Sequence, residues 1–388
     1  MMARAPGKQP LPLSVSKEVR QSVLDNLDDH LKFIESMVNI DSGADNPAGI
    51  SAVQELLAQA LERIGFKTRW RRTDAITHFK ASLAGDGAPV VLLGHADTVF
   101  NKGTSRRRPF IIKGHRGYGP GVVDMKGGLT VALAAVEGLV EKDTPRPPIE
   151  FVVVGDEEER TSAPPFLDQL ADAGACLVLE CGRPGGGYVV SRKGGLWAEV
   201  EAVGHSAHAG VNPEIGSNAI LVLCRELLRI AEFNGAREGL TVVPGKFSGG
   251  TATNVVPDKA VAHIDIRSPS ESDLDWIISR IGRFDRSPES NLTLAAHRRW
   301  PPMDAECGRS VADIYQQIAD ALHTAVHPVF TGGMSDGNWF SQANIPTIDG
   351  LGPIGGLDHG PDEYMEVNSI PDRAGLLAGT IVALRSRP

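Results

Sequence analysis

Three short runs of consecutive apolar residues stand out in the first half of the chain. They cover residues 90–93, 151–154 and 177–179, with a helical pattern near 127–139 between the first two. Unbroken apolar runs are typical of strands buried on both faces, and parallel strands need crossover helices to connect them. The sequence therefore predicts an α/β fold, a mixed sheet with helices on both faces, preceded by two amphipathic helices, one over 17–38 and one that begins at Asn46-Pro47 and stops at Gly65.

A smaller unit interrupts this alternation. After about residue 189 the sequence predicts strands at 196–203, 260–267 and 292–296 and helices at 217–230 and 271–283. At 388 residues the chain is long enough for two domains. We expect a catalytic domain over 16–190 and 300–388, an inserted α+β lid or dimerisation domain over 191–299, and a disordered tail over 1–15.

The composition limits which binding partners and which cell compartment we expect for this protein. The formal charge of −9 argues against a nucleic-acid partner, and no apolar run approaches the ~18 residues of a membrane span. Four irregularly spaced cysteines are unlike a secreted disulfide framework, and the first 15 residues lack the apolar core of a signal peptide. We therefore expect a cytoplasmic protein that binds neither nucleic acid nor membrane.

Candidate metal ligands follow each of the three apolar runs. His95 and Asp97 come after the first, the acidic run 156–159 after the second, and Glu180 after the third. Because open α/β sheets place their ligands at the carboxyl ends of strands, these side chains should lie close together, where like charges need cations to persist. An acidic run by itself is ordinarily a solvated loop. Imidazole and carboxylate ligands together suit zinc, cobalt or manganese.

Another carboxylate, Asp124, lies in the glycine-rich segment 119–128 just before the predicted helix. Asp and Gly together are typical of a turn and a helix N-cap. The same carboxylate would instead bridge two cations if the other acids lie nearby.

Six motifs in this order resemble the co-catalytic di-zinc metallopeptidase family of glutamate carboxypeptidase (carboxypeptidase G), acetylornithine deacetylase, succinyl-diaminopimelate desuccinylase and aminoacylase. The resemblance covers nearly the whole chain from about Ser16. Its matching segments are Gly94-His95-Ala96-Asp97-Thr98, Gly121-Val122-Val123-Asp124-Met125-Lys126-Gly127-Gly128, Asp156-Glu157-Glu158, Leu179-Glu180, Gly204-His205-Ser206-Ala207-His208-Ala209-Gly210 and Gly332-Gly333-Met334-Ser335-Asp336-Gly337.

The resemblance implies two Zn²⁺ ions per chain, with Co²⁺ or Mn²⁺ as possible substitutes. His95 and Glu180 would hold one ion, Glu158 and His359 the other, and Asp124 would bridge both. A hydrolase with this ligand set would cleave an amide bond.

The resemblance also implies three catalytic roles. Glu157 would be the general base, Asp97 would orient His95, and His208 of the inserted domain would stabilise the oxyanion across a homodimer. The acidic run leaves open whether the base and the ligand are Glu157 and Glu158 or Glu158 and Glu159. After the last histidine, where the family usually has a small residue and then an acid, Asp362 stands one step late.

Substrate choice points to residues beyond the metals. Arg267 resembles a family arginine that pairs with a substrate carboxylate, although a surface ion pair is its ordinary reading, and Asn254, Gly333 and Ser335 are the other candidates. The spacing fits the glutamate-carboxypeptidase branch, which would release a C-terminal amino acid such as glutamate from a small peptide or an N-acyl amino acid. An N-acyl amino acid deacylase of the acetylornithine or succinyl-diaminopimelate type and an N-carbamoyl amino acid amidohydrolase are the alternatives.

Overall fold

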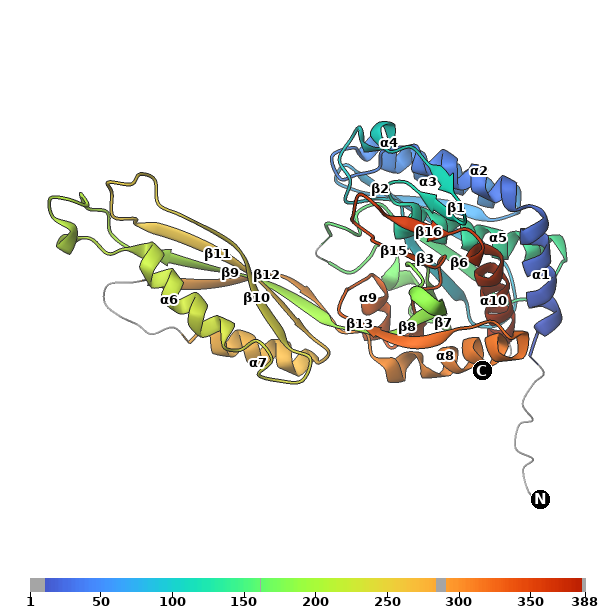
Figure 1. The fold of residues 1–388 in the computed structure, drawn as a ribbon. Coiled ribbons are helices and arrows are strands. Elements are labelled where there is room, and N and C mark those ends of the chain that lie inside the picture. The colour runs from blue at the N-terminus through green and yellow to red at the C-terminus, as the bar shows by residue number, and fades with distance from the viewer. Residues whose placement is uncertain (1–10, 161, 284–290, 386–388) are drawn as a thin grey trace, which may run out of the picture. The chain divides into compact units, whose positions relative to one another are not determined.

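The computed structural model describes residues 11–160, 162–283 and 291–385, with only the backbone of 296 and 297. The described residues form two compact units (Figure 1). The second unit comprises Arg192–Met303 and Thr331–Met334, and the rest of the described chain forms the first. The second unit thus ends at Met303, beyond the insertion expected at 191–299, and it also includes the short segment Thr331–Met334.

A six-stranded mixed sheet is the centre of the first unit, as the apolar runs predict. The strands β6, β3, β7 and β14 run parallel, whereas β2 is antiparallel to both of its neighbours. In sheet order the strands are β1 (Lys67–Thr73), β2 (Ile76–Leu83), β6 (Ile149–Val154), β3 (Val90–His95), β7 (Ala175–Val178) and β14 (Thr347–Ile348).

The sheet is buried on both faces because its central strands are apolar at every position. Val90 and Leu92 of β3 pack into one apolar core, and Val91 and Leu93 pack into another on the opposite face. Six helices contribute to the larger core and a short one to the smaller. They are α1 (Leu13–Asp25), α2 (Leu27–Val38), α3 (Pro47–Arg63), α5 (Gly127–Glu141), α8 (Ala305–Leu322) and α10 (Ser369–Leu384), and on the other side α9 (Gly337–Gln342).

The N-terminal helix differs from its prediction. The apolar stripe over 17–38 belongs to two helices, because Asn26 leaves the helical conformation and bonds the Ser22 carbonyl with its side chain. The helix α1 begins at Leu13, inside the tail expected over 1–15, and residues 1–10 lie outside the described chain.

Two smaller sheets and a short helix complete the first unit. One sheet has the order β15-β16-β5-β4, and the other pairs β13 with β8. The strand β16 pairs with β5, which brings the segment before α10 beside the segment before α5. The bounds are β4 (Ile111–Lys113), β5 (Arg116–Tyr118), β8 (Gly187–Arg192), β13 (His327–Thr331), β15 (Gly355–Gly356), β16 (Tyr364–Glu366) and α4 (Thr104–Arg107).

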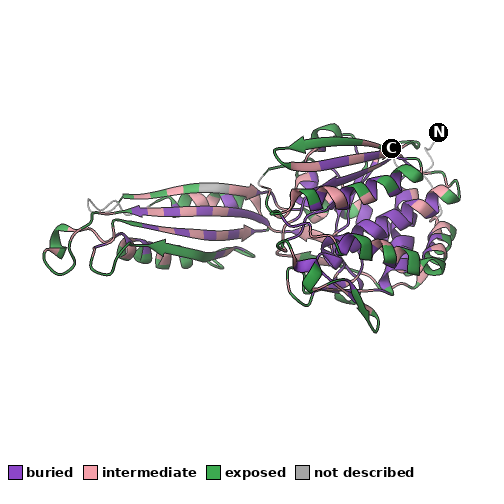
Figure 2. Ribbon diagram, turned by 90° about the horizontal axis from the view of Figure 1, so that it is seen from above, coloured by how far each residue is buried: buried purple, intermediate pink, exposed green. Residues whose placement is uncertain are grey.

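The second unit is an antiparallel sheet with the strand order β10-β11-β9-β12. Buried and half-buried residues alternate along β9 and β11, a pattern visible as alternating colours in Figure 2. The sequence analysis missed β10, whose exposed residues lack this alternation. The elements are β9 (Gly194–Val203), β10 (Thr241–Gly249), β11 (Lys259–Ser268), β12 (Asn291–Trp300), α6 (Ala219–Ala231) and α7 (Glu271–Ile281), and both helices pack on the sheet. Among the described residues, no helix is both long and apolar enough to cross a membrane.

Candidate metal centre

Three neighbouring strand ends supply the first part of the centre. His95 is the last residue of β3, Glu158 lies in the turn after β6, and Glu180 follows β7. Because β3 pairs in parallel with both β6 and β7, the three side chains reach the same edge of the sheet. The structure therefore brings these predicted ligands together.

Two loops complete the set of five predicted ligands. Asp124 lies in the segment Val122–Lys126 before α5, and His359 lies in the loop before β16. The Nε2 atom of His95 is 3.1 Å from Asp124 Oδ1 and 3.6 Å from Glu180 Oε1. The Nε2 atom of His359 is 3.1 Å from Asp124 Oδ2 and 3.3 Å from Glu158 Oε2. Two ligand groups thus share Asp124, which turns one oxygen to each.

The electrostatics of both groups favour positive charge. Burial opposes the charging of His95, but its hydrogen bonds with Asp124 and Asp97 hold its pKa well above the ordinary value. The hydrogen bonds with Asp124 and then Glu158 raise the pKa of His359 to about 11. Burial opposes the ionisation of Asp124, yet the two histidines hold its pKa far below the usual range. The field that stabilises these protonated histidines would also attract metal cations.

The donor chemistry fits a pair of divalent cations. Within each group the candidate ligand atoms lie within 4.8 Å of one another. One carboxylate oxygen of Glu158, Oε1, is buried without a hydrogen-bond partner in the described structure, and a buried carboxylate oxygen is costly unless a donor or a cation satisfies it. Two imidazole nitrogens with carboxylate oxygens suit zinc and also cobalt or manganese.

Asp97 contacts two of the predicted ligands. Its backbone carbonyl is 3.1 Å from His95 Nδ1, and its Oδ1 is 3.3 Å from the same nitrogen. Its other carboxylate oxygen accepts the backbone N–H of Glu158 at 3.0 Å. Asp97 thus touches His95, as the prediction requires, and also holds the turn after β6.

The acidic run separates into members with different surroundings. Glu158 belongs to a ligand group, whereas Glu159 is exposed. Burial raises the pKa of Glu157 well above its ordinary value; His95 opposes this, and the neighbouring acids Asp336, Glu180 and Glu158 add to it. These positions favour the register in which Glu157 is the base and Glu158 the ligand.

Two of the predicted residues, His208 and Asn254, lie in neighbouring loops of the second unit. The N–H of Ala209, next to His208, donates to the carbonyl of Asn254 at 3.0 Å, and both His208 and Asn254 are exposed. The Nδ1 atom of His208 accepts the N–H of Gly210 at 3.1 Å. In the neutral imidazole the proton is then assigned to Nε2, which becomes a hydrogen-bond donor.

Arg267, the predicted substrate-binding arginine of the second unit, is held by Asp265 of its own strand and by a loop carbonyl. Arg267 donates from Nε and Nη2 to Asp265, at 2.9 and 3.3 Å, and from Nη1 to the Gly332 carbonyl at 3.0 Å. These contacts use three of the five guanidinium N–H groups. The carbonyl of the neighbouring Gly333 accepts from Arg192 at 3.3 Å.

Ser335 belongs to the first unit and is almost completely buried. Its hydroxyl donates to Asp349 at 2.6 Å, and its N–H donates to Asn338 at 3.1 Å. The contacts of Ser335 therefore shape the loop before α9.

Three residues of the site environment received no role from the sequence. Arg160 forms buried ion pairs with Asp156 and Asp336, which join the turn after β6 to the loop before α9. Glu363 is 1% exposed and accepts N–H groups from the segment that carries Asp124. Asp336 lies inside one of the motifs that carry the resemblance. For Glu363 the available signal was the acidic residue expected after the last histidine, since Glu363 directly follows Asp362.

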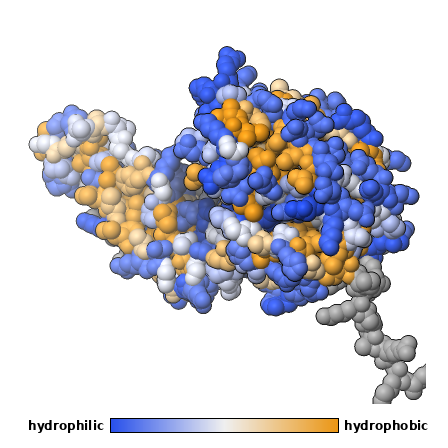
Figure 3. Space-filling view, turned by 45° about the vertical axis from the view of Figure 1, so that its right-hand side comes forward, coloured by the Kyte–Doolittle hydropathy of each residue, from blue (hydrophilic) through white to orange (hydrophobic). Residues whose placement is uncertain are grey.

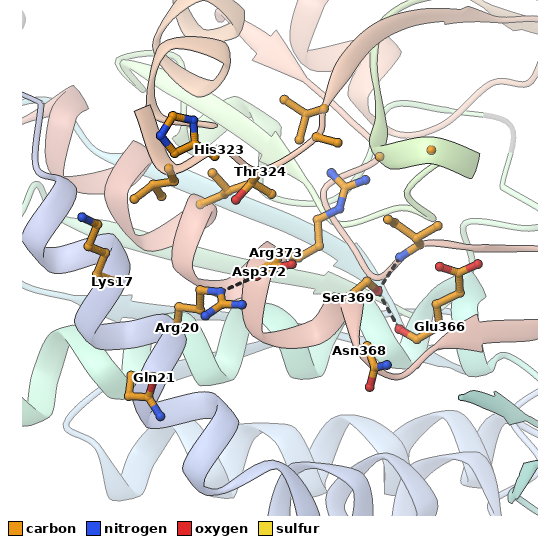
Figure 4. Close-up of a pocket in the computed structure, with 17 residues that line it drawn as sticks. Lys17, Arg20, Gln21, His323, Thr324, Glu366, Asn368, Ser369, Asp372 and Arg373 are labelled. Carbon is orange, nitrogen blue, oxygen red and sulfur yellow. Dashed lines mark hydrogen bonds and ion pairs between the residues drawn. The ribbon is translucent and has the colours of Figure 1, made fainter. Parts of the chain in front are cut away.

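A cavity of about 800 Å³ lies elsewhere in the first unit, between the start of α1, the end of α8 and the start of α10 (Figure 4). Arg20 and Asp372 form an ion pair on its wall, as the dashed line in Figure 4 shows. None of the predicted site residues lines this cavity. We therefore assign the chemistry to the two ligand groups and not to this hollow.

Comparisons with known proteins show the family of the chain. The chain matches the family described as peptidase family M20/M25/M40 over residues 91–383. It is 27% identical to carboxypeptidase G2 of Pseudomonas sp. (strain RS-16), across 91% of this chain and 89% of the relative. It is 26% identical to succinyl-diaminopimelate desuccinylase of Pseudoalteromonas atlantica, across 91% and 98%. Its fold is similar to that of a tripeptidase from Staphylococcus aureus, with a TM-score of 0.80, 21% identity and coverage of 93% and 99%.

Proposed function

Because the chain belongs to peptidase family M20/M25/M40 and is a metal-dependent hydrolase, we propose that it cleaves an amide bond next to a free carboxylate and releases a C-terminal amino acid such as glutamate. The observation that carries this proposal is the pair of ligand groups that share Asp124, with Glu157 beside them. The similarity to carboxypeptidase G2 supports the choice of substrate class.

We assign two Zn²⁺ ions to the two groups, one held by His95, Glu180 and Asp124 and the other by Glu158, His359 and Asp124. Zinc in such a centre would act as a Lewis acid on the carbonyl and make a water molecule acidic enough to attack near neutral pH. The carboxylates and imidazoles of the five residues fit this role, because all are ligands that zinc commonly takes in proteins.

Glu157 is the proposed general base. As water adds to the amide carbonyl carbon, its proton passes to the Glu157 carboxylate. When the C–N bond breaks, Glu157 returns that proton to the leaving nitrogen, so the products are a carboxylic acid and an amine. The raised pKa of the buried carboxyl suits a group that must hold a proton between these two steps.

The second unit supplies the remaining proposed contacts. With Nδ1 occupied by the Gly210 N–H, His208 offers an Nε2–H donor for the developing oxyanion. Arg267 would pair with the substrate carboxylate, since Asp265 orients its guanidinium and two N–H groups remain. We keep Asn254, Gly333 and Ser335 as residues that shape the surroundings of the substrate.

We also propose that the second unit joins two copies of this chain. The edge strand β10 is largely exposed, and on α6 the side chains of Leu221 and Leu228 are 53% and 72% exposed. Apolar side chains reach the surface of both units in Figure 3. An open strand edge beside an apolar helix face favours pairing with a second copy, which would also allow His208 to act across the dimer.

A cytoplasmic location is likewise our proposal. All four cysteines, Cys176, Cys181, Cys224 and Cys307, are free thiols in the structure. Unpaired cysteines are typical of proteins in a reducing compartment.

The first experiment compares hydrolysis of N-acyl-glutamate, dipeptides, N-acetylornithine, N-succinyl-diaminopimelate and N-carbamoyl amino acids by zinc- or cobalt-loaded protein. The variant Glu157→Ala should lose about 10²–10⁴-fold in kcat while it still binds metal. The matched control is Glu159→Ala, a neighbouring exposed glutamate, which should keep its activity.

Cleavage of N-acyl-glutamate or of peptides with C-terminal glutamate would support the carboxypeptidase proposal. The similarity to succinyl-diaminopimelate desuccinylase favours deacylation as the second candidate, and selective turnover of the succinylated substrate would decide for it. Equal activity of Glu157→Ala and wild type would refute the assignment of the base.

A further inference from the structure

A buried carboxylate joins two segments that carry metal ligands. Glu363 is 1% exposed and lies four positions after His359, just before β16. Its Oε2 accepts the N–H of Gly121 at 3.0 Å, and its Oε1 accepts the N–H groups of Val123 at 2.9 Å and Asp124 at 3.2 Å. These bonds connect residues up to 242 positions apart in the sequence.

The three hydrogen bonds from backbone amides hold the main chain of Asp124, the ligand that both groups share. One donor is the N–H of Asp124 itself, and the others lie on either side of Val122 in the same tight segment. Three backbone donors converge on this single buried carboxyl group, so its position limits the movement of residues 121–124. These bonds fix the point from which the Asp124 carboxylate turns one oxygen to each histidine.

The loop that carries His359 needs such an anchor. Leu357 and His359 both have positive φ values, 59° and 63°, which non-glycine residues adopt rarely and at a cost in energy. Arg108 holds the other side of this loop by donating to the carbonyls of Gly360 at 3.2 Å and Pro361 at 2.6 Å. Arg108 thus holds the two residues directly after His359, and Glu363 holds the end of the same loop.

We propose that Glu363 is a positioning residue of the metal centre, which fixes Asp124 and His359 relative to each other through the amides of residues 121–124. This inference rests on the metal centre assigned in the proposed function. Asp362, which the sequence pattern singles out after His359, is exposed, and its neighbour Glu363 makes the contacts. In the described structure the carboxyl group of Glu363 bonds backbone N–H groups and not the side-chain atoms of the predicted ligands. Its effect on the metal centre would therefore pass through the backbone.

The test compares wild type with Glu363→Gln, Glu363→Asp and the control Glu366→Gln. Glutamine keeps the size of the side chain but turns an NH₂ group toward an amide donor, and aspartate keeps the charge but is one methylene shorter. Glu366 lies three positions further on, within β16, and its side chain makes no hydrogen bond or ion pair with the described residues. Zn²⁺ affinity is measured by competition with a fluorescent chelator, and Co²⁺-loaded protein gives the visible absorption spectrum of the site.

We expect Glu363→Gln and Glu363→Asp to bind Zn²⁺ about 10–100-fold more weakly and to change the Co²⁺ spectrum, with Glu366→Gln unchanged. The thermal unfolding temperature of the metal-free proteins distinguishes an effect on the stability of the fold from an effect on metal binding. If a Glu363 variant loses metal-free stability but keeps the affinity and the spectrum of wild type, the inference is wrong. If wild type itself fails to bind two ions, the proposed metal centre is wrong instead.

Discussion

Asp124 is the residue on which both ligand groups depend. Each of its carboxylate oxygens is 3.1 Å from a different histidine nitrogen, and the side chain is 10% exposed. Glu180 and Glu158, in contrast, each belong to one group only. A change at Asp124 should therefore affect both ions, and a change at either glutamate should affect one.

Asp124→Asn and Glu180→Gln test this difference. We expect Asp124→Asn to weaken both Zn²⁺ sites, because it removes one ligand oxygen and the negative charge that both groups share, and Glu180→Gln to weaken only the site to which Glu180 belongs. Changes outside the ligand shell cost about 10–100-fold in metal affinity, so loss of a ligand should cost at least as much. Zinc stoichiometry after dialysis against a graded chelator series is the measurement. Retention of two tightly held ions by Asp124→Asn would contradict the shared-ligand arrangement.

At the scale of the element, the turn after β6 is held by a buried cation. Arg160 pairs with Asp156 within the turn and with Asp336 before α9, and its side chain is 8% exposed. Burial opposes the charge of this guanidinium, but the acids around it, Asp336 first, hold its pKa above the usual range. The turn that presents Glu157 and Glu158 is thus tied to a distant loop.

Arg160→Met should lower the free energy of unfolding by about 3–5 kcal/mol, because it leaves the buried carboxylate of Asp336 and the half-buried carboxylate of Asp156 without their cation. Urea unfolding of the metal-free protein measures the change. Arg106→Met, at an exposed arginine of α4, is the matched control and should change stability by less than about 0.5 kcal/mol. A similar small effect at Arg160 would show that solvent reaches the ion pair.

The helix α5 contains a titrating group away from the metal ligands. Burial, and then the nearby Glu141, raise the pKa of Glu137 from 4.5 to about 7. The folded chain therefore binds this proton more tightly than the unfolded chain does. The resulting stability is fully present below about pH 4.5 and is lost as the pH rises to about 7.

The variant Glu137→Gln cannot ionise at this position and should not lose stability there as the pH rises. At pH 8 the free energy of unfolding of the variant should exceed that of wild type by about 1 kcal/mol, a value reduced to allow for the partial exposure of Glu137. At pH 4 the two proteins should not differ. Urea unfolding at the two pH values checks the sign. Glu55→Gln, at an exposed position of α3, should show no pH-dependent difference from wild type. A gain at pH 4 instead would reverse the assigned shift.

At the scale of the whole molecule, each unit has its own apolar core. The core of the second unit contains residues of β9, β10, β11, α6 and α7, and the two cores of the first unit lie on the two faces of its sheet. All five predicted metal ligands belong to the first unit. His208, Asn254 and Arg267 belong to the second unit.

Leu228→Asp tests the proposed homodimer. A charge at this exposed position of α6 should shift the protein to monomer in analytical ultracentrifugation, because burying an unpaired carboxylate at an interface is costly. Val211→Asp, at a loop residue that is 75% exposed, is the control for an apolar residue outside α6 and β10. If wild type sediments as a monomer at all concentrations, the dimer proposal fails.

The sequence by itself determined the buried parallel strands and the candidate ligands at their ends. His95, Glu158 and Glu180 follow unbroken apolar runs, and a strand buried on both faces has few places for a polar side chain except beyond its end. The resemblance also gave Asp124 and His359 as candidate ligands, and the structure brings all five candidates together.

Tertiary structure alone decided what supports these ligands. Glu363 bonds backbone amides 242 positions away, and Arg160 meets Asp336 across 176 positions. A backbone amide has the same donor in nearly every residue, so no side-chain pattern marks the segment that receives such a bond. The partners of Glu363 and Arg160 are therefore set by the packing of distant loops and cannot be read from local sequence.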